Sequence, residues 1–265
     1  MCCDQDDVWL PDKIEKTLRE MRIAQSRSAE RIDEKSVSTE KTTQETREIL
    51  PVENIHAEIT NESPSLWNTD AGNPTELPCL VYTDLRVVDE SLAEVSGSMN
   101  LYQKLSCEDT RINHVLVQNV VTGCTMMINR RLRDMVLSLK DPDKIVMHDW
   151  WAALIAAQFG VLRYLDEPTI LYRQHGENDT GAKKISLLWY LREVLFQGKD
   201  KKDSLEMMRK QAEALAEIFP VEKDSVVAVY AGIHTLSKPG RLRVYRKYKL
   251  TSKPLSRQLA ILLFC

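Results

Sequence analysis

The chain has 265 residues, of which 43% are hydrophobic and 28% are charged, and its formal net charge at pH 7 is -3. This composition is typical of a soluble protein with one large or two small domains. The slight negative charge argues against a surface built throughout for nucleic acid. No apolar run approaches the roughly 20 residues that cross a bilayer, and the six cysteines form no CxxC pair, so we expect a cytoplasmic protein with reduced thiols and no signal peptide.

The first polar motif lies at the start of the chain, where Asp4, Asp6 and Asp7 occupy three of four positions. Carboxylates this close repel one another, so a hard divalent cation such as Mg²⁺ or Mn²⁺ is a natural counter-ion. The same carboxylates can instead act as an acidic cap for the helix that we expect from Pro11 to about Arg22. Both interpretations stay open at this point.

The predicted helix carries Ile14, Leu18 and Met21 at helical spacing, which indicates one apolar face. Residues 23–76 differ in composition, because Ser, Thr, Glu, Lys and Arg dominate and the apolar residues are isolated. A segment with so little apolar surface to bury is expected to be a charged, flexible insertion.

Ordered structure is expected again from Leu77. Residues 79–89 are rich in β-branched and aromatic side chains, and they predict a strand. The apolar run 116–129 predicts a further strand, interrupted by Gly123, where the backbone either approaches a ligand closely or forms a bulge. Residues 130–139 predict a helix with basic residues at its start.

The second polar motif is His148–Trp151, which precedes an alanine-rich stretch that ends at Gly160. This pattern predicts a buried helix that begins at the motif. Asp149 at the helix start is either a cap or a rigidly held general base. In the second case Trp150 and Trp151 would form the wall of a sugar site.

The third polar motif follows a predicted hairpin, with strands at 161–166 and from 169 onward and a turn at Glu167–Pro168. The second strand leads to Gln174 and His175. A histidine at a strand end is usually a surface residue, but here it belongs to the third polar cluster of one chain and is a candidate ligand.

The C-terminal part is predicted to be helical, with an apolar stripe over 204–219 that indicates core packing. A basic stretch at 241–249 and an apolar end at 259–264 follow. They favour either contact with an anionic membrane surface or a solvated basic helix that packs on the core. We expect no nucleic-acid partner, because no recognition motif accompanies the charge.

Taken together, these motifs resemble the family 2 glycosyltransferases, and within them the rhamnosyltransferase-like branch of cell-surface polysaccharide synthesis. The resemblance covers most of residues 1 to about 190 and implies an α/β fold of the GT-A (Rossmann-like) type. The matching runs are Asp4–Trp9, Pro11–Lys13, Val121–Arg130, His148–Trp151 and Tyr172–Asn178.

The resemblance also implies roles for single residues. Asp149 would be the catalytic base, and Asp6 and His175 would hold Mg²⁺ or Mn²⁺ on the donor diphosphate. The substrate-binding residues would be Asp4, Gly123, Trp150 and Gln174. The implied partners are a nucleotide-sugar donor, dTDP-L-rhamnose or a UDP-sugar, and a saccharide or lipid-linked acceptor. The implied location is the cytoplasm, with peripheral contact to the inner face of the plasma membrane through the C-terminal tail.

One departure from the family concerns the DxD element, which begins at residue 4 instead of following a nucleotide-binding half-domain. We therefore expect the C-terminal portion of such an enzyme. Its parts would be the DxD element and its helix at 1–22, the insertion at 23–76, the acceptor-side core at 77–190 and the helical tail at 191–265. Three functions stay open: an inverting transferase for a sugar such as L-rhamnose, a truncated non-catalytic remnant or interaction module, and a metal-dependent phosphohydrolase.

Overall fold

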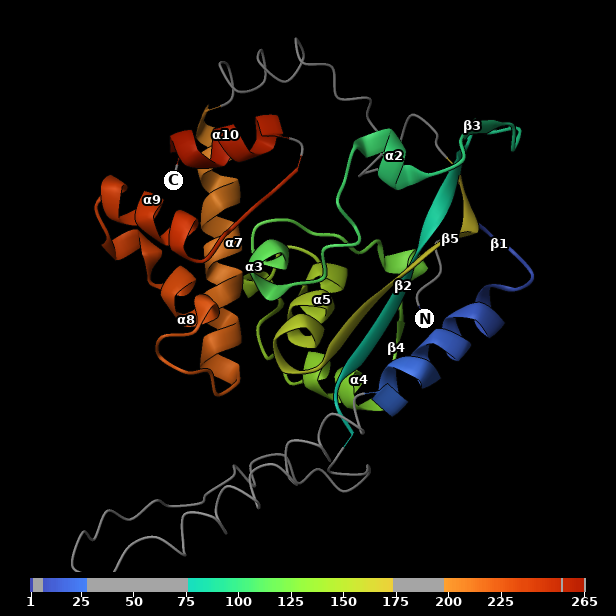
Figure 1. The fold of residues 1–265 in the computed structure, drawn as a ribbon, viewed down its shortest axis with the longest axis horizontal. Coiled ribbons are helices and arrows are strands. Elements are labelled where there is room, and N and C mark those ends of the chain that lie inside the picture. Colours follow the sequence, from blue (N-terminus) through green and yellow to red (C-terminus); the bar gives the residue numbers. More distant parts are fainter. Residues whose placement is uncertain (2–6, 28–75, 174–197, 254, 265) are drawn as a thin grey trace, which may run out of the picture.

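The computed structural model describes residues 1, 7–27, 76–173, 198–253 and 255–264 (Figure 1). These residues form a mixed α/β structure around a five-stranded sheet with the strand order β1-β5-β2-β3, in which β4 also pairs with β2. The expected α/β class is confirmed at this level.

The sheet is built on one long parallel pair, β2 (Cys79–Val88) and β5 (Val161–Arg173), which pair from Cys79 opposite Val161 to Val88 opposite Arg173 with two shifts of register between these ends. β1 (Val8–Trp9) pairs antiparallel with β5. β3 (Glu94–Ser96) and β4 (Met127–Ile128) pair antiparallel with opposite ends of β2. Every residue of β2 except Arg86 is buried, as expected for a strand covered on both faces.

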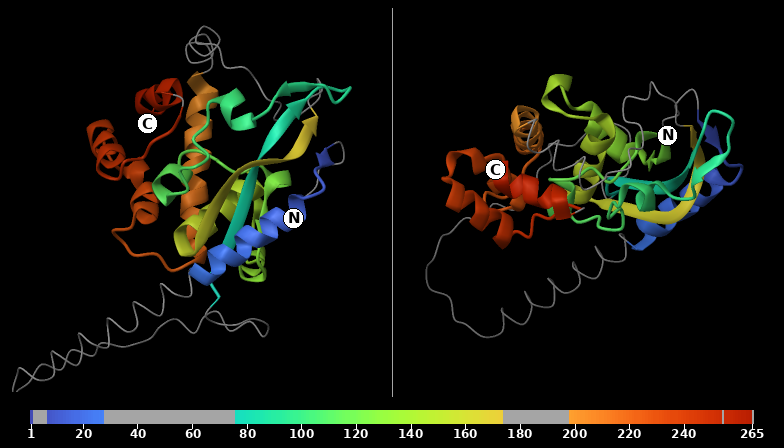
Figure 2. Two further views of the ribbon diagram at one scale, coloured as in Figure 1. Left: turned by 45° about the vertical axis from the view of Figure 1, so that its right-hand side comes forward. Right: turned by 90° about the horizontal axis from the view of Figure 1, so that it is seen from above.

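The two faces of β2 pack against different elements, as the two views of Figure 2 show. Cys79 and Val81 contact Met21 and Ala24 of the helix at 13–27. Leu80 and Tyr82 point to the opposite face, into the main core. This alternation is the period-2 pattern of a strand, and it makes the sheet the middle layer of this part of the fold.

The predicted hairpin at 161–173 is wrong, because β5 is one continuous strand of 13 residues. The register with β2 shifts between Thr83 and Asp84 and again between Asp84 and Arg86, so β5 contains irregular, bulged positions around Glu167 and Pro168. Proline has no backbone N–H, and bulges are among the few strand positions that tolerate it. The turn signal at Glu167–Pro168 therefore marks a bulge.

The helical elements lie between and after the strands. The elements after the helix at 13–27 are α2 (Met99–Gln103), α3 (Ile112–Val115), η2 (Gly123–Thr125), α4 (Arg130–Leu137), η3 (Pro142–Lys144), α5 (His148–Phe159), α7 (Gly198–Ile218), α8 (Val226–Ala231), η4 (Ile233–Thr235), α9 (Lys238–Lys247) and α10 (Leu255–Phe264). Four predicted elements are confirmed to within a few residues at their ends: the strand at 79–89, the helix at 130–139, the buried helix at His148 and the helical C-terminal part. The exception is α7, which begins well before residue 204.

The predicted strand at 116–129 is mostly wrong. Only Met127 and Ile128 form a strand, while residues 123–125 form the 3-10 helix η2. Leu116, Val117, Val120 and Val121 are all buried in the main core. A short apolar run that is buried on all sides has no periodicity that separates a strand from a compact irregular segment.

The helix at 13–27 is confirmed, but only Met21 of the three residues predicted for its apolar face is buried. Lys13, Thr17 and Met21 are buried, whereas Ile14 is 54% exposed and Leu18 is 38% exposed. Lys13 lies with its ammonium group 5.1 Å from the centre of the Trp9 ring, and Thr17 donates to the Lys13 carbonyl oxygen at 2.7 Å. Polar residues thus face the sheet because local partners satisfy them.

The ends of the predicted insertion lie close together. The helix continues through residues 23–27, and Gln25 Nε2 donates to Glu76 Oε1 at 2.5 Å just before β2 begins. Asn129 Nδ2 donates to the same Glu76 oxygen at 2.9 Å. Residues 28–75 therefore leave and rejoin the described structure at neighbouring points, which is the arrangement that an insertion requires.

The helical tail shares the core of the sheet domain. Trp151 of α5 lies 6.3 Å from Phe219 at the end of α7, measured between ring centres, and Tyr230 of α8 packs edge-on against Tyr245 of α9. All four side chains belong to the same buried cluster. The boundary expected at residue 190 thus separates two parts of one core.

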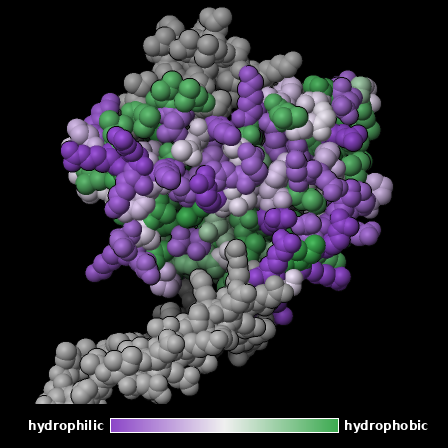
Figure 3. All heavy atoms as spheres, in the orientation of Figure 1, coloured by the Kyte–Doolittle hydropathy of each residue, from purple (hydrophilic) through white to green (hydrophobic). Residues whose placement is uncertain are grey.

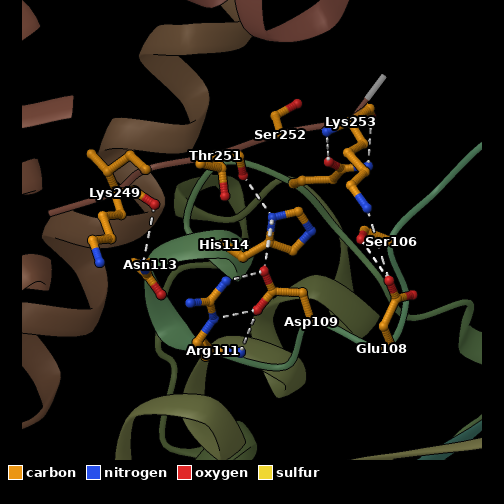
Figure 4. A network of polar contacts seen from close by, with 12 residues as sticks. Ser106, Glu108, Asp109, Arg111, Asn113, His114, Lys249, Thr251, Ser252 and Lys253 are labelled. Atoms are coloured by element: carbon orange, nitrogen blue, oxygen red, sulfur yellow. Dashed lines mark hydrogen bonds and ion pairs between the residues drawn. The ribbon is translucent and has the colours of Figure 1, made fainter. Parts of the chain in front are cut away.

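Side chains of the α3 region also hold the connection between α9 and α10 (Figure 4). Asn113 Nδ2 donates to the carbonyl oxygens of Tyr248 and Lys249, and His114 Nδ1 lies 2.6 Å from the carbonyl oxygen of Thr251. Since a carbonyl oxygen only accepts, this ring nitrogen carries the proton. Gln118 exchanges two hydrogen bonds with the Lys253 backbone, so the connection is fixed along its length.

We expect Gly160→Ala to destabilise the fold. Gly160 lies where β2 and β5 begin to pair, and a Cβ atom there would overlap the carbonyl oxygen of Pro78. Forcing extra volume into such a contact lowers the free energy of unfolding by about 1–3 kcal/mol. Urea unfolding of Gly160→Ala and of the matched variant Gly97→Ala measures this, because Gly97 is exposed and a Cβ there meets only the end of the Glu94 side chain. Equal midpoints for the two variants would contradict the account.

Candidate functional site

The carboxyl ends of the parallel strands β2 and β5 lie at one edge of the sheet, where Val88 pairs with Arg173. In open α/β sheets, ligands bind beyond this edge. The chain before β1 reaches the same place, because Asp7 Oδ1 accepts the backbone N–H of Arg173 at 3.3 Å. Asp7 follows Asp6 directly, and Arg173 precedes Gln174 and His175 directly.

Four predicted site residues, Asp4, Asp6, Gln174 and His175, lie outside the described residues. Within the described ranges, no group of three or more His, Cys, Asp or Glu side chains is arranged to hold a metal ion. The expected metal site therefore stays a prediction that rests on residues next to the Asp7–Arg173 contact.

Asp149, the predicted base, lies within the described residues. It lies in the first turn of α5, after the N-cap residue Met147, and is 3% exposed. Its Oδ1 accepts the backbone N–H of Trp150 at 2.6 Å and the Nδ2 of Asn119 at 3.1 Å. The backbone N–H of Gly123 also donates to this carboxyl group. Donors from α5, the segment after α3 and η2 thus fix its orientation, and the positive end of the helix dipole stabilises its charge.

Burial raises the pKa of Asp149 above its ordinary value, while the charge of His148 and the hydrogen bonds from Trp150, Asn119 and Gly123 oppose this effect. Desolvation dominates because the carboxylate has few contacts with water. A raised pKa brings the carboxylate closer to the range in which a general base works efficiently at neutral pH. The fixed orientation of Asp149 and the direction of its pKa shift are both compatible with the role of a base.

Gly123 lies directly against this carboxylate. A Cβ atom added to Gly123 would be 2.8 Å from His148 Nε2 and 3.7 Å from Asp149 Oδ2. The backbone of η2 approaches the start of α5 this closely because residue 123 has no side chain. The structure thus brings together two of the predicted site residues, Gly123 and Asp149.

Two further residues belong to this site and were not predicted. His148 is exposed, lies over Gly123 and lowers the pKa of Asp149. Its place next to Asp149 in the sequence was a usable signal. The second residue, Asn119, has no recognisable sequence signal. It is 30 residues away from Asp149 in the sequence, and only the fold brings the two together.

The predicted role of Trp150 in sugar binding is contradicted by its burial. Trp150 is 4% exposed, and its Nε1 donates to the Val115 carbonyl oxygen at 2.6 Å. Trp151 is fully buried in the main core. Both indole rings therefore anchor α5 in the core, and neither offers an open face for a sugar ring.

A small apolar cluster connects the Asp149 site to the edge of the sheet. Its buried members are Leu85, Val87, Met99, Cys124, Ile170 and Tyr172, with Trp9 packed against them. Cys124 follows Gly123 in η2, and Ile170 and Tyr172 belong to the end of β5. The backbone that donates to Asp149 is therefore packed against the same strand end that leads to Gln174 and His175.

Comparison with known proteins finds a relative whose name states an activity. The chain is 25% identical over 164 residues to the dTDP-rhamnosyl transferase RfbG of Shigella flexneri. The match covers 55% of this chain and 56% of that protein, so the chain spans little more than half of the relative's length. No family model matches the chain, and no solved structure matches it significantly.

Over this part the chain is similar to a glycosyltransferase, at a level of identity that supports a distant relationship. The mixed α/β sheet is compatible with a fragment of a Rossmann-like glycosyltransferase. Membership of family 2 and the GT-A subtype stay predictions. In the described part of the chain, every helix is too short or too polar to span a bilayer.

The raised pKa of Asp149 predicts a specific dependence of stability on pH. The folded chain keeps this proton to higher pH than the unfolded chain does, so its contribution to stability is present at low pH and is lost as pH rises through the folded pKa. The wild-type free energy of unfolding should therefore fall relative to that of Asp149→Asn across this interval.

Urea unfolding from about pH 3 to about pH 8 measures this difference. Asp143→Asn is the matched control, because Asp143 is an exposed carboxyl in η3. A wild-type curve that runs parallel to that of Asp149→Asn, or that rises relative to it, would show that burial does not raise this pKa.

Proposed function

We propose that this chain transfers a sugar from a nucleotide-sugar donor to a saccharide acceptor with inversion at the sugar carbon, and that Asp149 is the general base. The observation that carries the proposal is the state of Asp149: it is 3% exposed, held by donors from three segments, and has a raised pKa. The similarity to a dTDP-rhamnosyl transferase supports the class of reaction.

In this proposal the acceptor hydroxyl donates its proton to Asp149 as its oxygen attacks the anomeric carbon. The new carbon–oxygen bond forms on the face opposite the diphosphate, the bond to the diphosphate oxygen breaks, and the diphosphate leaves with the electron pair. One base on one side gives inversion without a covalent intermediate.

The donor side of the proposal rests on Asp4, Asp6, Gln174 and His175. Carboxylate oxygens and an imidazole nitrogen suit Mg²⁺ or Mn²⁺, so the types of side chain fit the implied metal. The contact between Asp7 and Arg173 supports the grouping, because these residues flank Asp6 and Gln174 in the sequence. When bound, such an ion stabilises the negative charge of the leaving diphosphate.

The identity of the substrates is part of the proposal. The name of the Shigella flexneri relative favours dTDP-L-rhamnose as donor, with UDP-sugars as the competing class. The acceptor is a saccharide or a lipid-linked saccharide of the kind used in cell-surface polysaccharide synthesis. We propose the cytoplasm as the location, with family 2 as the family.

We expect Asp149→Asn to lower the rate of sugar transfer roughly 100- to 10,000-fold, because a positioned base contributes a factor of this size. Donor binding and metal dependence should stay unchanged, since an amide of the same shape keeps the packing at the start of α5. Transfer of labelled sugar from dTDP-L-rhamnose and UDP-sugars to saccharide acceptors measures the rate, and calorimetry measures donor binding.

Asp143→Asn provides the control, because it removes an exposed carboxyl outside the site. Near-normal transfer by Asp149→Asn would rule out its role as base. Donor binding without any transfer by the wild-type chain would favour a non-catalytic interaction module.

A further inference from the structure

The last forty or so residues of the chain differ strongly in charge from the rest. Residues 226–265 contain no Asp or Glu, although the whole chain has a net charge of -3. The basic residues of this segment are Lys238, Arg241, Arg243, Arg246, Lys247, Lys249, Lys253 and Arg257. Positive charge is therefore concentrated in one segment, and the remaining chain is correspondingly acidic.

The fold sorts the residues of α9 into two faces. Val244 and Tyr245 are buried in the main core. Lys238, Arg243, Arg246 and Lys247 are exposed, and a helix with about 3.6 residues per turn places the last three of them on the half of its surface that faces away from Val244 and Tyr245. Leu242 lies between them and is 38% exposed. We call this exposed side the basic face of α9.

Exposed leucines lie next to the basic face in the sequence. Leu236 precedes α9 and is 38% exposed, while Leu255 and Leu259, one turn apart on α10, are 72% and 53% exposed. Figure 3 shows hydrophobic and hydrophilic side chains side by side on this part of the surface, over α9 and α10. Cations and exposed leucines are the two kinds of side chain that contact anionic head groups and the acyl boundary in a membrane interface.

The basic face is presented rigidly. Buried Val244 and Tyr245 anchor α9, and the bonds from Asn113, His114 and Gln118 fix the connection to α10 (Figure 4). One acidic side chain lies beside a cation of this region, because Lys253 Nζ is 3.9 Å from Glu108 Oε1. Lys253 is therefore partly neutralised, and we leave it out of the basic face.

We propose that the basic face of α9, together with the exposed leucines Leu242, Leu255 and Leu259, binds the surface of a membrane that contains anionic lipids. Cations adjacent to such a surface are attracted by its negative potential, and leucine side chains gain free energy by entering the acyl boundary. A nucleic acid would use the cations but not the exposed leucines, so the pattern favours lipid. This proposal does not depend on Asp149 or on sugar transfer.

The test is sedimentation of the full chain with vesicles of phosphatidylcholine alone and of phosphatidylcholine with about 30% phosphatidylglycerol. We expect binding to the anionic vesicles only. The triple variant R243Q/R246Q/K247Q should lower the partition coefficient roughly 100-fold, because each cation near the surface contributes close to a factor of five. Raising the salt concentration should weaken wild-type binding in the same direction.

The matched control is R22Q/R27Q/K140Q, which removes the same types and number of exposed cations elsewhere. It should bind like the wild type. Separately, L255Q/L259Q should weaken binding with little change in its salt dependence, which identifies the apolar contribution.

Three results would overturn the proposal. The first is equal binding to neutral and anionic vesicles, and the second is an equal loss of binding in the two triple variants. The third is a folded chain that binds polyuridylate RNA but neither kind of vesicle. Every side chain substituted in these variants is exposed, so we expect the variants to fold. Circular dichroism of each variant checks this.

Discussion

The parallel pairing of β2 with β5 is the constraint on which the rest of the described structure depends. It buries β2 on both faces, so the helix at 13–27 and the α5 core must cover opposite sides of the sheet. It also brings the carboxyl ends of two strands to one edge, where β1 adds Asp7 beside Arg173. Bulged positions in β5 absorb the extra residues and accommodate Pro168, which keeps the pairing continuous past that point.

The candidate site depends on this pairing through a chain of packed groups. The end of β5 packs against Cys124 in η2, and the neighbouring Gly123 donates its backbone N–H to Asp149 at the start of α5. The two buried tryptophans of α5 then fix that helix in the core, which the C-terminal helices complete. Asp149 is therefore positioned by the whole fold, and the basic face of α9 is held by the same core at a separate surface.

Sequence reasoning succeeded where one residue pattern has one physical solution. The β-branched run at 79–89 and the alanine-rich run ending at Gly160 gave the correct elements, and Asp149 next to a helix start was correctly placed. It failed where a pattern has two solutions. Glu167–Pro168 is compatible with a turn or with a bulge, and the run at 116–129 is compatible with a strand or with a buried irregular segment. Ile14 and Leu18 have the spacing of a buried helix face, but in the fold Lys13 and Thr17 are buried instead. Asn119 carried no local signal, because only tertiary structure brings it to Asp149.

The measurement that tests the central claim most directly is calorimetric titration of the chain with dTDP-L-rhamnose and with UDP-sugars, in the presence and absence of Mn²⁺. The account predicts binding of one donor that requires the metal and that is weakened in Asp6→Asn and His175→Ala but not in Asp143→Asn. A folded chain that binds none of these donors with Mn²⁺ present would contradict the proposal of sugar transfer, and the motifs would then be the remains of a lost donor site.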